Sequence, residues 1–123
     1  MAKILVVDDS ETVRNRLVQD LKAVGHLVIE AEDGVKGLQT LDTNQDTDII
    51  ISDVNMPEMD GITMCSKISE KEQYKNIHLF VLTTEFDQDL KAKGKAAGVK
   101  LWITKPVKMP KLIAVIKKVM ERN

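Results

Sequence analysis

The sequence has 123 residues, of which 43% are hydrophobic and 30% are charged, as in one ordinary globular domain, and this excludes a two-domain enzyme. Its longest unbroken apolar run, residues 112–116, is far shorter than the roughly 18 residues of a membrane-spanning helix. The apolar start of the chain ends at Asp8 and Asp9, too early for a secretory signal, and Cys65 is a single cysteine, so we expect a cytoplasmic protein.

The net charge of −1 conceals an uneven distribution along the chain. Residues 1–82 carry eight basic and fifteen acidic side chains, a balance of −7, whereas residues 83–123 carry ten basic and four acidic side chains, a balance of +6. The lysines of the basic part are not interleaved with aromatic residues or arginine clusters, so we expect no nucleic-acid partner. A solvated helical face that meets an acidic partner is the favoured interpretation.

The first predicted strand spans residues 4–7, and a predicted helix follows it. Ser10 is a suitable N-cap for this helix, and Gly25 lies just past its end. One apolar face of the helix is formed by Val13, Leu17, Leu21 and Val24. This spacing is typical of an amphipathic helix that packs on a sheet.

Four more strands and four more helices alternate along the rest of the chain. The strands are predicted at residues 27–29, 49–51, 77–82 and 101–103. Three helices are predicted at residues 34–42, 61–71 and 88–97, and a last helix has Pro110 near its first turn. Most strand runs are continuously apolar, which predicts a sheet covered on both faces. The alternation predicts an α/β fold, a doubly wound sheet of five parallel strands in the order 2-1-3-4-5 with five helices.

Polar side chains follow four of the predicted strands at their carboxyl ends, where open α/β sheets have their sites. They are Asp8 and Asp9 after the first strand, Asp53 after the third, Thr83 and Thr84 after the fourth, and Lys105 after the fifth. These four strands are neighbours in the predicted order. One cleft is therefore expected to collect three carboxylates, a hydroxyl and an ammonium group.

This set of groups indicates phosphoryl chemistry. Carboxylates that lie close together repel unless a cation sits among them, and a hard divalent ion such as Mg²⁺ prefers oxygen ligands and keeps a position for a phosphoryl oxygen. Lys105 and the hydroxyl of Thr83 would then bind the other phosphoryl oxygens. Asp53, at the centre, is the predicted nucleophile that becomes an aspartyl phosphate.

The residues around these positions resemble a known family, the receiver domains of bacterial two-component response regulators. Four motifs carry the resemblance: Ile4-Leu5-Val6-Val7-Asp8-Asp9-Ser10, Ile51-Ser52-Asp53-Val54-Asn55-Met56-Pro57-Glu58-Met59-Asp60-Gly61, Val81-Leu82-Thr83-Thr84 and Ile103-Thr104-Lys105-Pro106. The resemblance implies the flavodoxin-like, CheY-like version of the fold. It covers nearly the whole chain, so we expect residues 1–123 to form a single receiver domain without an output domain.

By this resemblance, Asp53 accepts a phosphoryl group from a CheA-like histidine kinase. The protein would catalyse only its own phosphorylation and dephosphorylation and would not be an enzyme in the wider sense. The same resemblance assigns magnesium to Asp8, Asp9, Asp53 and the backbone carbonyl of Asn55. It makes Thr83 the switching hydroxyl and Lys105 the group that senses the phosphoryl oxygens, and it implies a cis peptide bond between Lys105 and Pro106.

The match is especially close to stand-alone chemotaxis regulators of the CheY type. In these, phosphorylation switches the face built from the fourth helix, fifth strand and fifth helix, which then binds a target such as the flagellar motor switch. The resemblance thus implies a monomer with a protein target and no contact with membranes. Stand-alone receivers also act as phosphate shuttles or sinks, and both uses remain open at this point.

Three features near the site bear on its regulation. The family usually has Tyr or Phe three residues before the lysine, but this chain has Trp102, which either moves inward on activation or stays outside in both states. Thr84 is β-branched and is predicted to restrict access to the phosphoryl group. Asn55 and Glu85 flank the site and are predicted to tune hydrolysis.

The sequence disfavours two other classes of function. A phosphohydrolase of the haloacid dehalogenase type needs an Asp-x-Asp motif after the first strand, whereas this chain reads Asp8-Asp9-Ser10. A pseudo-receiver, which binds partners independently of phosphorylation, would be expected to lack some of the key residues, and all are present. No glycine-rich nucleotide-binding motif occurs in the sequence.

Overall fold

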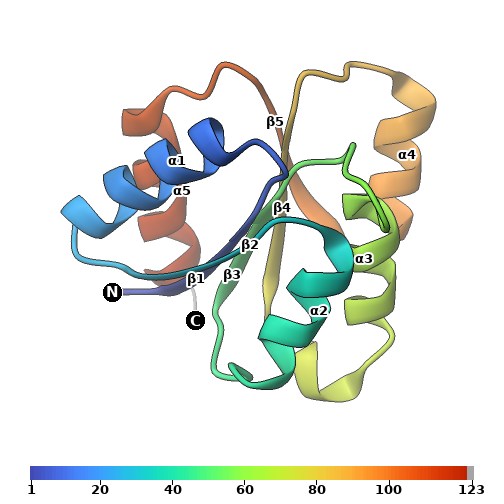
Figure 1. Ribbon diagram of the computed structural model, residues 1–123, viewed down its shortest axis with the longest axis horizontal. Helices are drawn as coiled ribbons and strands as arrows, with labels where there is room; N and C mark the ends of the chain where they lie inside the picture. Colours follow the sequence, from blue (N-terminus) through green and yellow to red (C-terminus); the bar gives the residue numbers. More distant parts are fainter. Residues whose placement is uncertain (122–123) are drawn as a thin grey trace.

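The computed structural model describes residues 1–121 and contains a sheet of five parallel strands between two layers of helices (Figure 1). The strands are β1 (Lys3–Val7), β2 (Leu27–Ala31), β3 (Ile49–Ser52), β4 (His78–Thr83) and β5 (Val99–Thr104). The helices are α1 (Glu11–Ala23), α2 (Gly34–Asp42), α3 (Gly61–Ser69), α4 (Gln88–Ala96) and α5 (Met109–Glu121), with a short 3₁₀ helix at Glu72–Tyr74. The strand order is β2-β1-β3-β4-β5, which confirms the predicted fold class.

Residues with short polar side chains form the N-caps of the helices α1, α2 and α3. Ser10 caps α1 as predicted, since its hydroxyl accepts a hydrogen bond from the N–H of Val13. Asp33 and Asp60 cap α2 and α3 in the same way, with their carboxylates accepting from backbone N–H groups. The loops from β1 to α1 and from β2 to α2 are therefore short, whereas residues 53–60 form a longer loop between β3 and α3.

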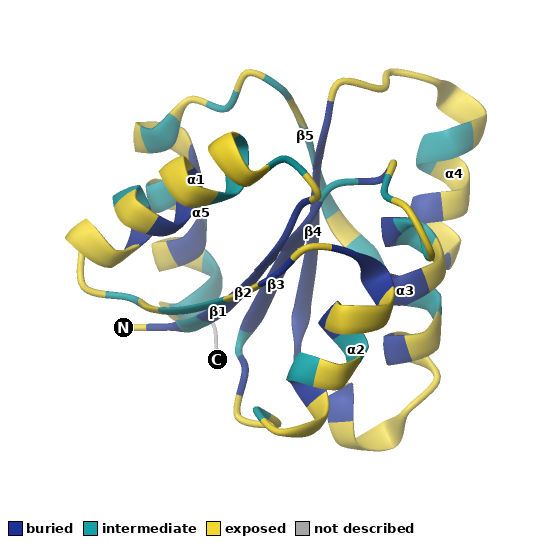
Figure 2. Ribbon diagram, viewed as in Figure 1, coloured by how far each residue is buried: buried dark blue, intermediate teal, exposed yellow. Residues whose placement is uncertain are grey.

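The sheet separates two hydrophobic cores. Helices α1 and α5 cover one face, and α2, α3 and α4 cover the other (Figure 1). Side chains that alternate along β1 serve the two cores in turn, with Ile4 and Val6 in the first and Leu5 and Val7 in the second. The central strands β1, β3 and β4 are accordingly almost entirely buried, whereas much of each helix remains exposed on its outer side (Figure 2).

Burial on both faces does not extend to the two edge strands. Leu27 of β2 is 55% exposed, and β5 is only partly buried along its length. Val24, which the helical spacing placed on the apolar face of α1, is 48% exposed because α1 ends at Ala23. Within residues 1–121, none of the helices has the length and apolarity that crossing a membrane would require.

Candidate functional site

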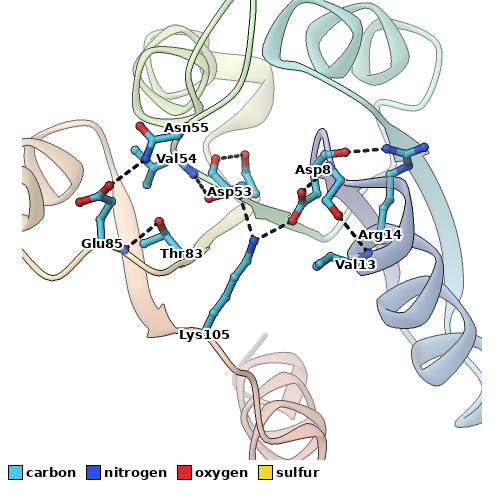
Figure 3. A network of polar contacts seen from close by, with 11 residues as sticks. Asp8, Val13, Arg14, Asp53, Val54, Asn55, Thr83, Glu85 and Lys105 are labelled. Carbon is cyan, nitrogen blue, oxygen red and sulfur yellow. Dashed lines mark hydrogen bonds and ion pairs between the residues drawn. The ribbon is translucent and has the colours of Figure 1, made fainter.

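The predicted side chains meet at the carboxyl-terminal edge of the sheet (Figure 3). Asp8 follows β1, Asp53 follows β3, Thr83 ends β4 and Lys105 follows β5. Because these four strands are consecutive in the sheet, their ends bring together residues as far apart in the sequence as Asp8 and Lys105. The geometry of the site therefore follows directly from the strand order.

Lys105 bridges two of the carboxylates. Its Nζ atom donates hydrogen bonds to Oδ2 of Asp8 over 3.2 Å and to Oδ2 of Asp53 over 3.1 Å. The lysine side chain is 18% exposed, so water screens these ion pairs less than it screens pairs on the surface. Burial alone would lower the pKa of Lys105, but the hydrogen bonds and negative charges of the two aspartates outweigh it and raise the pKa. The ammonium group therefore stays charged at neutral pH.

Asp8, Asp9 and Asp53 form a cluster of oxygen ligands. Each offers one carboxylate oxygen, and these three atoms lie within 4.8 Å of one another. Burial raises the pKa of Asp8, while the backbone N–H of Ser10 and the charge of Lys105 offset part of that rise. A hard divalent cation prefers such oxygen donors and would relieve the repulsion among the carboxylates. The donor set therefore fits Mg²⁺.

The loop from β3 to α3 holds the backbone of Asp53. Its N–H donates to the carbonyl of Val7 over 2.9 Å, and its Oδ1 atom accepts from the N–H of Val54 over 2.7 Å. At the start of α3, a Cβ atom on Gly61 would come within 2.0 Å of the Asp53 carbonyl oxygen. Any side chain at position 61 would therefore displace the segment that carries Asp53.

The loops after β3 and β4 meet at the mouth of the site (Figure 3). Thr83 is 1% exposed, and its hydroxyl oxygen accepts a hydrogen bond from the N–H of Glu85 over 3.2 Å. Nδ2 of Asn55 donates to Oε1 of Glu85 over 3.1 Å. The two predicted tuning residues, Asn55 and Glu85, are thus in direct contact, and Thr83 is bound to the same loop.

Trp102 lies half-buried on β5 and contacts two elements. Its indole N–H donates to the backbone carbonyl of Glu85 over 3.3 Å. A Cβ atom on Gly94 of α4 would lie 3.1 Å from Cζ3 of the ring, so the indole packs directly on the helix backbone. In this structure the ring therefore links the β4–α4 loop to α4.

Thr84 is an exposed residue that follows β4, as Lys105 follows β5. Both residues line a groove of about 550 Å³ between α1 and the segment that joins β5 to α5. The Lys105–Pro106 peptide bond in this segment is cis. Thr84 and Lys105 thus share one groove, and the restriction of access by Thr84 stays a prediction.

Sequence reasoning missed one residue that reaches the site, Arg14 of α1. Its Nη1 atom donates to the backbone carbonyl of Asp8 over 2.6 Å, and its Nε atom donates to Oε1 of Glu30 on β2 over 2.9 Å. The available signal was an arginine one turn after the N-cap Ser10. That signal is weak, because most helical arginines extend into solvent.

Comparison with known proteins shows which family shares this arrangement. Residues 4–117 match the family model for the response regulator receiver domain. The chain belongs to the response regulator receiver family. This confirms the predicted family and agrees with the fold described above.

The receiver domain is similar over most of its length to chemotaxis regulators. It is 40% identical to the chemotaxis protein CheY1 of Helicobacter pylori over 105 residues, which are 85% of each chain. The crystal structure of Vibrio cholerae CheY4 superposes with a TM-score of 0.89 at 37% identity, covering 97% of this chain and 98% of that one. A chain of the CheX–CheY–BeF₃–Mg²⁺ complex from Borrelia burgdorferi gives a TM-score of 0.87 at 29% identity, covering 97% and 89% of the two chains. The chain is thus a CheY-like receiver domain, and the roles of its individual site residues stay predictions.

Proposed function

We propose that this receiver domain is a stand-alone chemotaxis regulator that accepts a phosphoryl group on Asp53 from a CheA-like histidine kinase. The observation that carries the proposal is the bridge from Lys105 to both Asp53 and Asp8, at the edge where four strand ends meet. We also propose that it acts in the cytoplasm as a monomer. Its catalysis would be limited to its own phosphorylation and dephosphorylation.

The proposed reaction transfers the phosphoryl group between two side chains. A carboxylate oxygen of Asp53 forms the new O–P bond while the P–N bond of the kinase phosphohistidine breaks, and the electron pair of that bond returns to the imidazole. Lys105, which is already within 3.1 Å of the Asp53 carboxylate, would neutralise charge on the transferred oxygens. Thr83 would donate a hydrogen bond from its hydroxyl to another of these oxygens, and its contact with Glu85 leaves this donor free because the hydroxyl oxygen only accepts from the Glu85 N–H.

We propose that Asp8, Asp9, Asp53 and the backbone carbonyl of Asn55 hold the magnesium ion. When bound, Mg²⁺ would neutralise the carboxylates and stabilise negative charge that develops on the phosphoryl oxygens. The clustering of the three carboxylates within 4.8 Å supports this set. The similar chain from Borrelia burgdorferi belongs to a complex that includes BeF₃ and Mg²⁺, which supports the same choice of cation.

We propose that the α4-β5-α5 face carries the signal to a target such as the flagellar motor switch. Glu85 connects this face to the site, because its N–H contacts Thr83 and its carbonyl accepts from Trp102. A groove of about 560 Å³ between α4 and β5 is lined by Trp102 together with Lys91, Lys95 and Lys100. Its positive charge favours an acidic target segment.

The test is the binding of beryllofluoride, which mimics a phosphoryl group on a carboxylate, measured by calorimetry with and without Mg²⁺. The wild-type domain is expected to bind it only when Mg²⁺ is present, and the Asp53→Asn variant is expected not to bind. Asp60→Asn is the matched control, because asparagine caps a helix as well as aspartate does, so α3 keeps its start. Binding that persists in Asp53→Asn, or that needs no Mg²⁺, would contradict the proposed site.

A further inference from the structure

Arg14 makes contacts that a solvent-facing helical arginine would not make. Its side chain is only 13% exposed, although α1 faces solvent along its outer side. The guanidinium group donates in two directions, from Nη1 to the Asp8 carbonyl over 2.6 Å and from Nε to Glu30 over 2.9 Å. A planar guanidinium group can make the two bonds from two different nitrogens, whereas all the donors of a lysine ammonium lie on one nitrogen.

These contacts secure the turn that carries two of the three clustered carboxylates. The N–H of Asp8 donates to the carbonyl of Ala31 over 3.2 Å, so β2 holds the residue on one side of the peptide chain. Arg14 holds the carbonyl of Asp8 on the other side, as Figure 3 shows. Arg14 is held in turn by Glu30, which is next to Ala31 on β2. With the backbone of Asp8 fixed at both ends, the turn that carries the carboxylates of Asp8 and Asp9 is restrained before any cation binds.

The positive charge of Arg14 must be neutralised if Arg14 is not to weaken the binding of a cation nearby. A bare cation next to a magnesium site would repel Mg²⁺, and partial burial weakens the screening of this repulsion. Glu30 pairs with the guanidinium group at 2.9 Å and cancels its charge at a distance. The pair can therefore anchor the turn while adding no net positive charge to the site.

We propose that Arg14 is a positioning residue for the magnesium site. Arg14 holds the Asp8–Asp9 turn through the Asp8 carbonyl, and Glu30 neutralises the charge of Arg14. This inference rests on the proposed function, since it assumes that the carboxylate cluster binds Mg²⁺. It extends the site beyond the residues that contact the metal or the phosphoryl group. Partners that orient metal ligands in this way are typically worth about 10-fold to 100-fold in metal affinity.

The test is the dissociation constant of Mg²⁺, measured by calorimetry without a phosphodonor, alongside the free energy of unfolding in urea. Arg14→Met is expected to raise the dissociation constant about tenfold, and Arg14→Lys to restore only part of the loss. Arg16→Met is the matched control, since Arg16 is 84% exposed on the same helix, and it should bind Mg²⁺ like the wild type. A variant Arg14→Met that is less stable but binds Mg²⁺ as tightly as the wild type would overturn the proposal.

Glu30→Gln tests the charge balance and does not depend on whether Arg14→Met folds. Its amide oxygen can still accept from Arg14, but the positive charge is left uncompensated. We expect the Mg²⁺ dissociation constant to rise about threefold at about 0.05 M salt and to approach the wild-type value at about 0.5 M salt. Unchanged affinity in both Glu30→Gln and Arg14→Lys would overturn the proposal. A wild-type domain that does not bind Mg²⁺ at all would instead contradict the proposed function on which the inference rests.

Discussion

Lys105 forms ion pairs with both Asp8 and Asp53, so it acts as the counter-charge of the site when no metal is bound. Its raised pKa means that the ammonium group keeps this role throughout the neutral range. A divalent cation among the same carboxylates would feel the positive charge of Lys105 at short range. The lysine therefore has opposite effects on the two proposed ligands, because it attracts a phosphoryl group and repels Mg²⁺.

Lys105→Met is therefore expected to bind Mg²⁺ more tightly than the wild type, by at least about threefold at low salt, while it is phosphorylated more slowly. Calorimetry measures the first effect, and the time course of phosphorylation by a small phosphodonor measures the second. The control is Lys108→Met, since Lys108 is exposed in the same β5–α5 segment. Equal or weaker Mg²⁺ binding in Lys105→Met would contradict the electrostatic competition.

Thr84 offers a second test at the scale of a single side chain. Because Thr84 is exposed and lines the same groove as Lys105, Thr84→Ala is expected to shorten the lifetime of the phosphorylated state about threefold, a barrier change of about 0.7 kcal/mol. The lifetime is measured from the decay of the phosphorylated protein by intact mass. Thr84→Val keeps the branched shape without the hydroxyl and should retain the wild-type lifetime. An unchanged lifetime in Thr84→Ala would count against steric restriction.

Among the elements, α4 depends most on a contact with one side chain. Gly94 is its one buried residue within the described helix, and the indole of Trp102 lies against it. Glycine inside a helix costs about 1 kcal/mol relative to alanine, so its presence here indicates that the close approach of the ring matters more than helix propensity. The contact connects the predicted switch residue to the helix at one side of the α4-β5-α5 face.

Gly94→Ala is expected to push the ring away from α4, since the new Cβ atom would lie 3.1 Å from Cζ3 of Trp102. Trp102 is the single tryptophan of the sequence, so its emission spectrum reports on the ring directly. We expect a shift of the emission to longer wavelength and a gain in unfolding free energy well below the ~1 kcal/mol of helix propensity. Lys93→Ala, at the exposed neighbouring position, should leave the emission unchanged. A full gain in stability with an unchanged spectrum would show that the ring does not constrain the helix.

The order and type of the elements could be predicted from the sequence because strands and helices alternate without a break. The apolar runs by themselves did not show how far each strand is buried. Residues 27–29 are as apolar as residues 49–51, yet β2 is an exposed edge and β3 is wholly buried. An apolar run indicates that a strand forms, whereas the burial of that strand depends on which strands and helices pack beside it.

The site could likewise be predicted in part. Asp8, Asp53, Thr83 and Lys105 could be predicted to meet because each follows a strand, and parallel strands end at a common edge. The contacts of Arg14 could not be predicted, because they depend on how α1 packs against the end of β2. The packing of Trp102 on α4 is likewise a contact between elements whose spacing the sequence does not show.

At the scale of the whole molecule, the acidic cluster and most of the basic part of the chain lie in different regions. The acidic cluster lies at the carboxyl-terminal strand ends, where Lys105 joins it, while the basic part of the chain supplies α4, β5 and α5. A phosphoryl group on Asp53 would add negative charge at the site, whereas the lysine-lined groove at Trp102 would remain positive. On the proposed function, the site would attract a phosphodonor with its cation, and the proposed target surface would attract an acidic protein segment.

The central claim is that Asp53 is a phosphoryl acceptor that requires Mg²⁺. It is tested most directly by the intact mass of the wild-type protein and of Asp53→Asn after incubation with acetyl phosphate, with and without Mg²⁺, under rapid acid quench. We predict a gain of one phosphoryl group in the wild-type protein with Mg²⁺ and none in the other three samples. No gain in the wild-type protein, or an equal gain in Asp53→Asn, would contradict the claim and favour a binding module that works independently of phosphorylation.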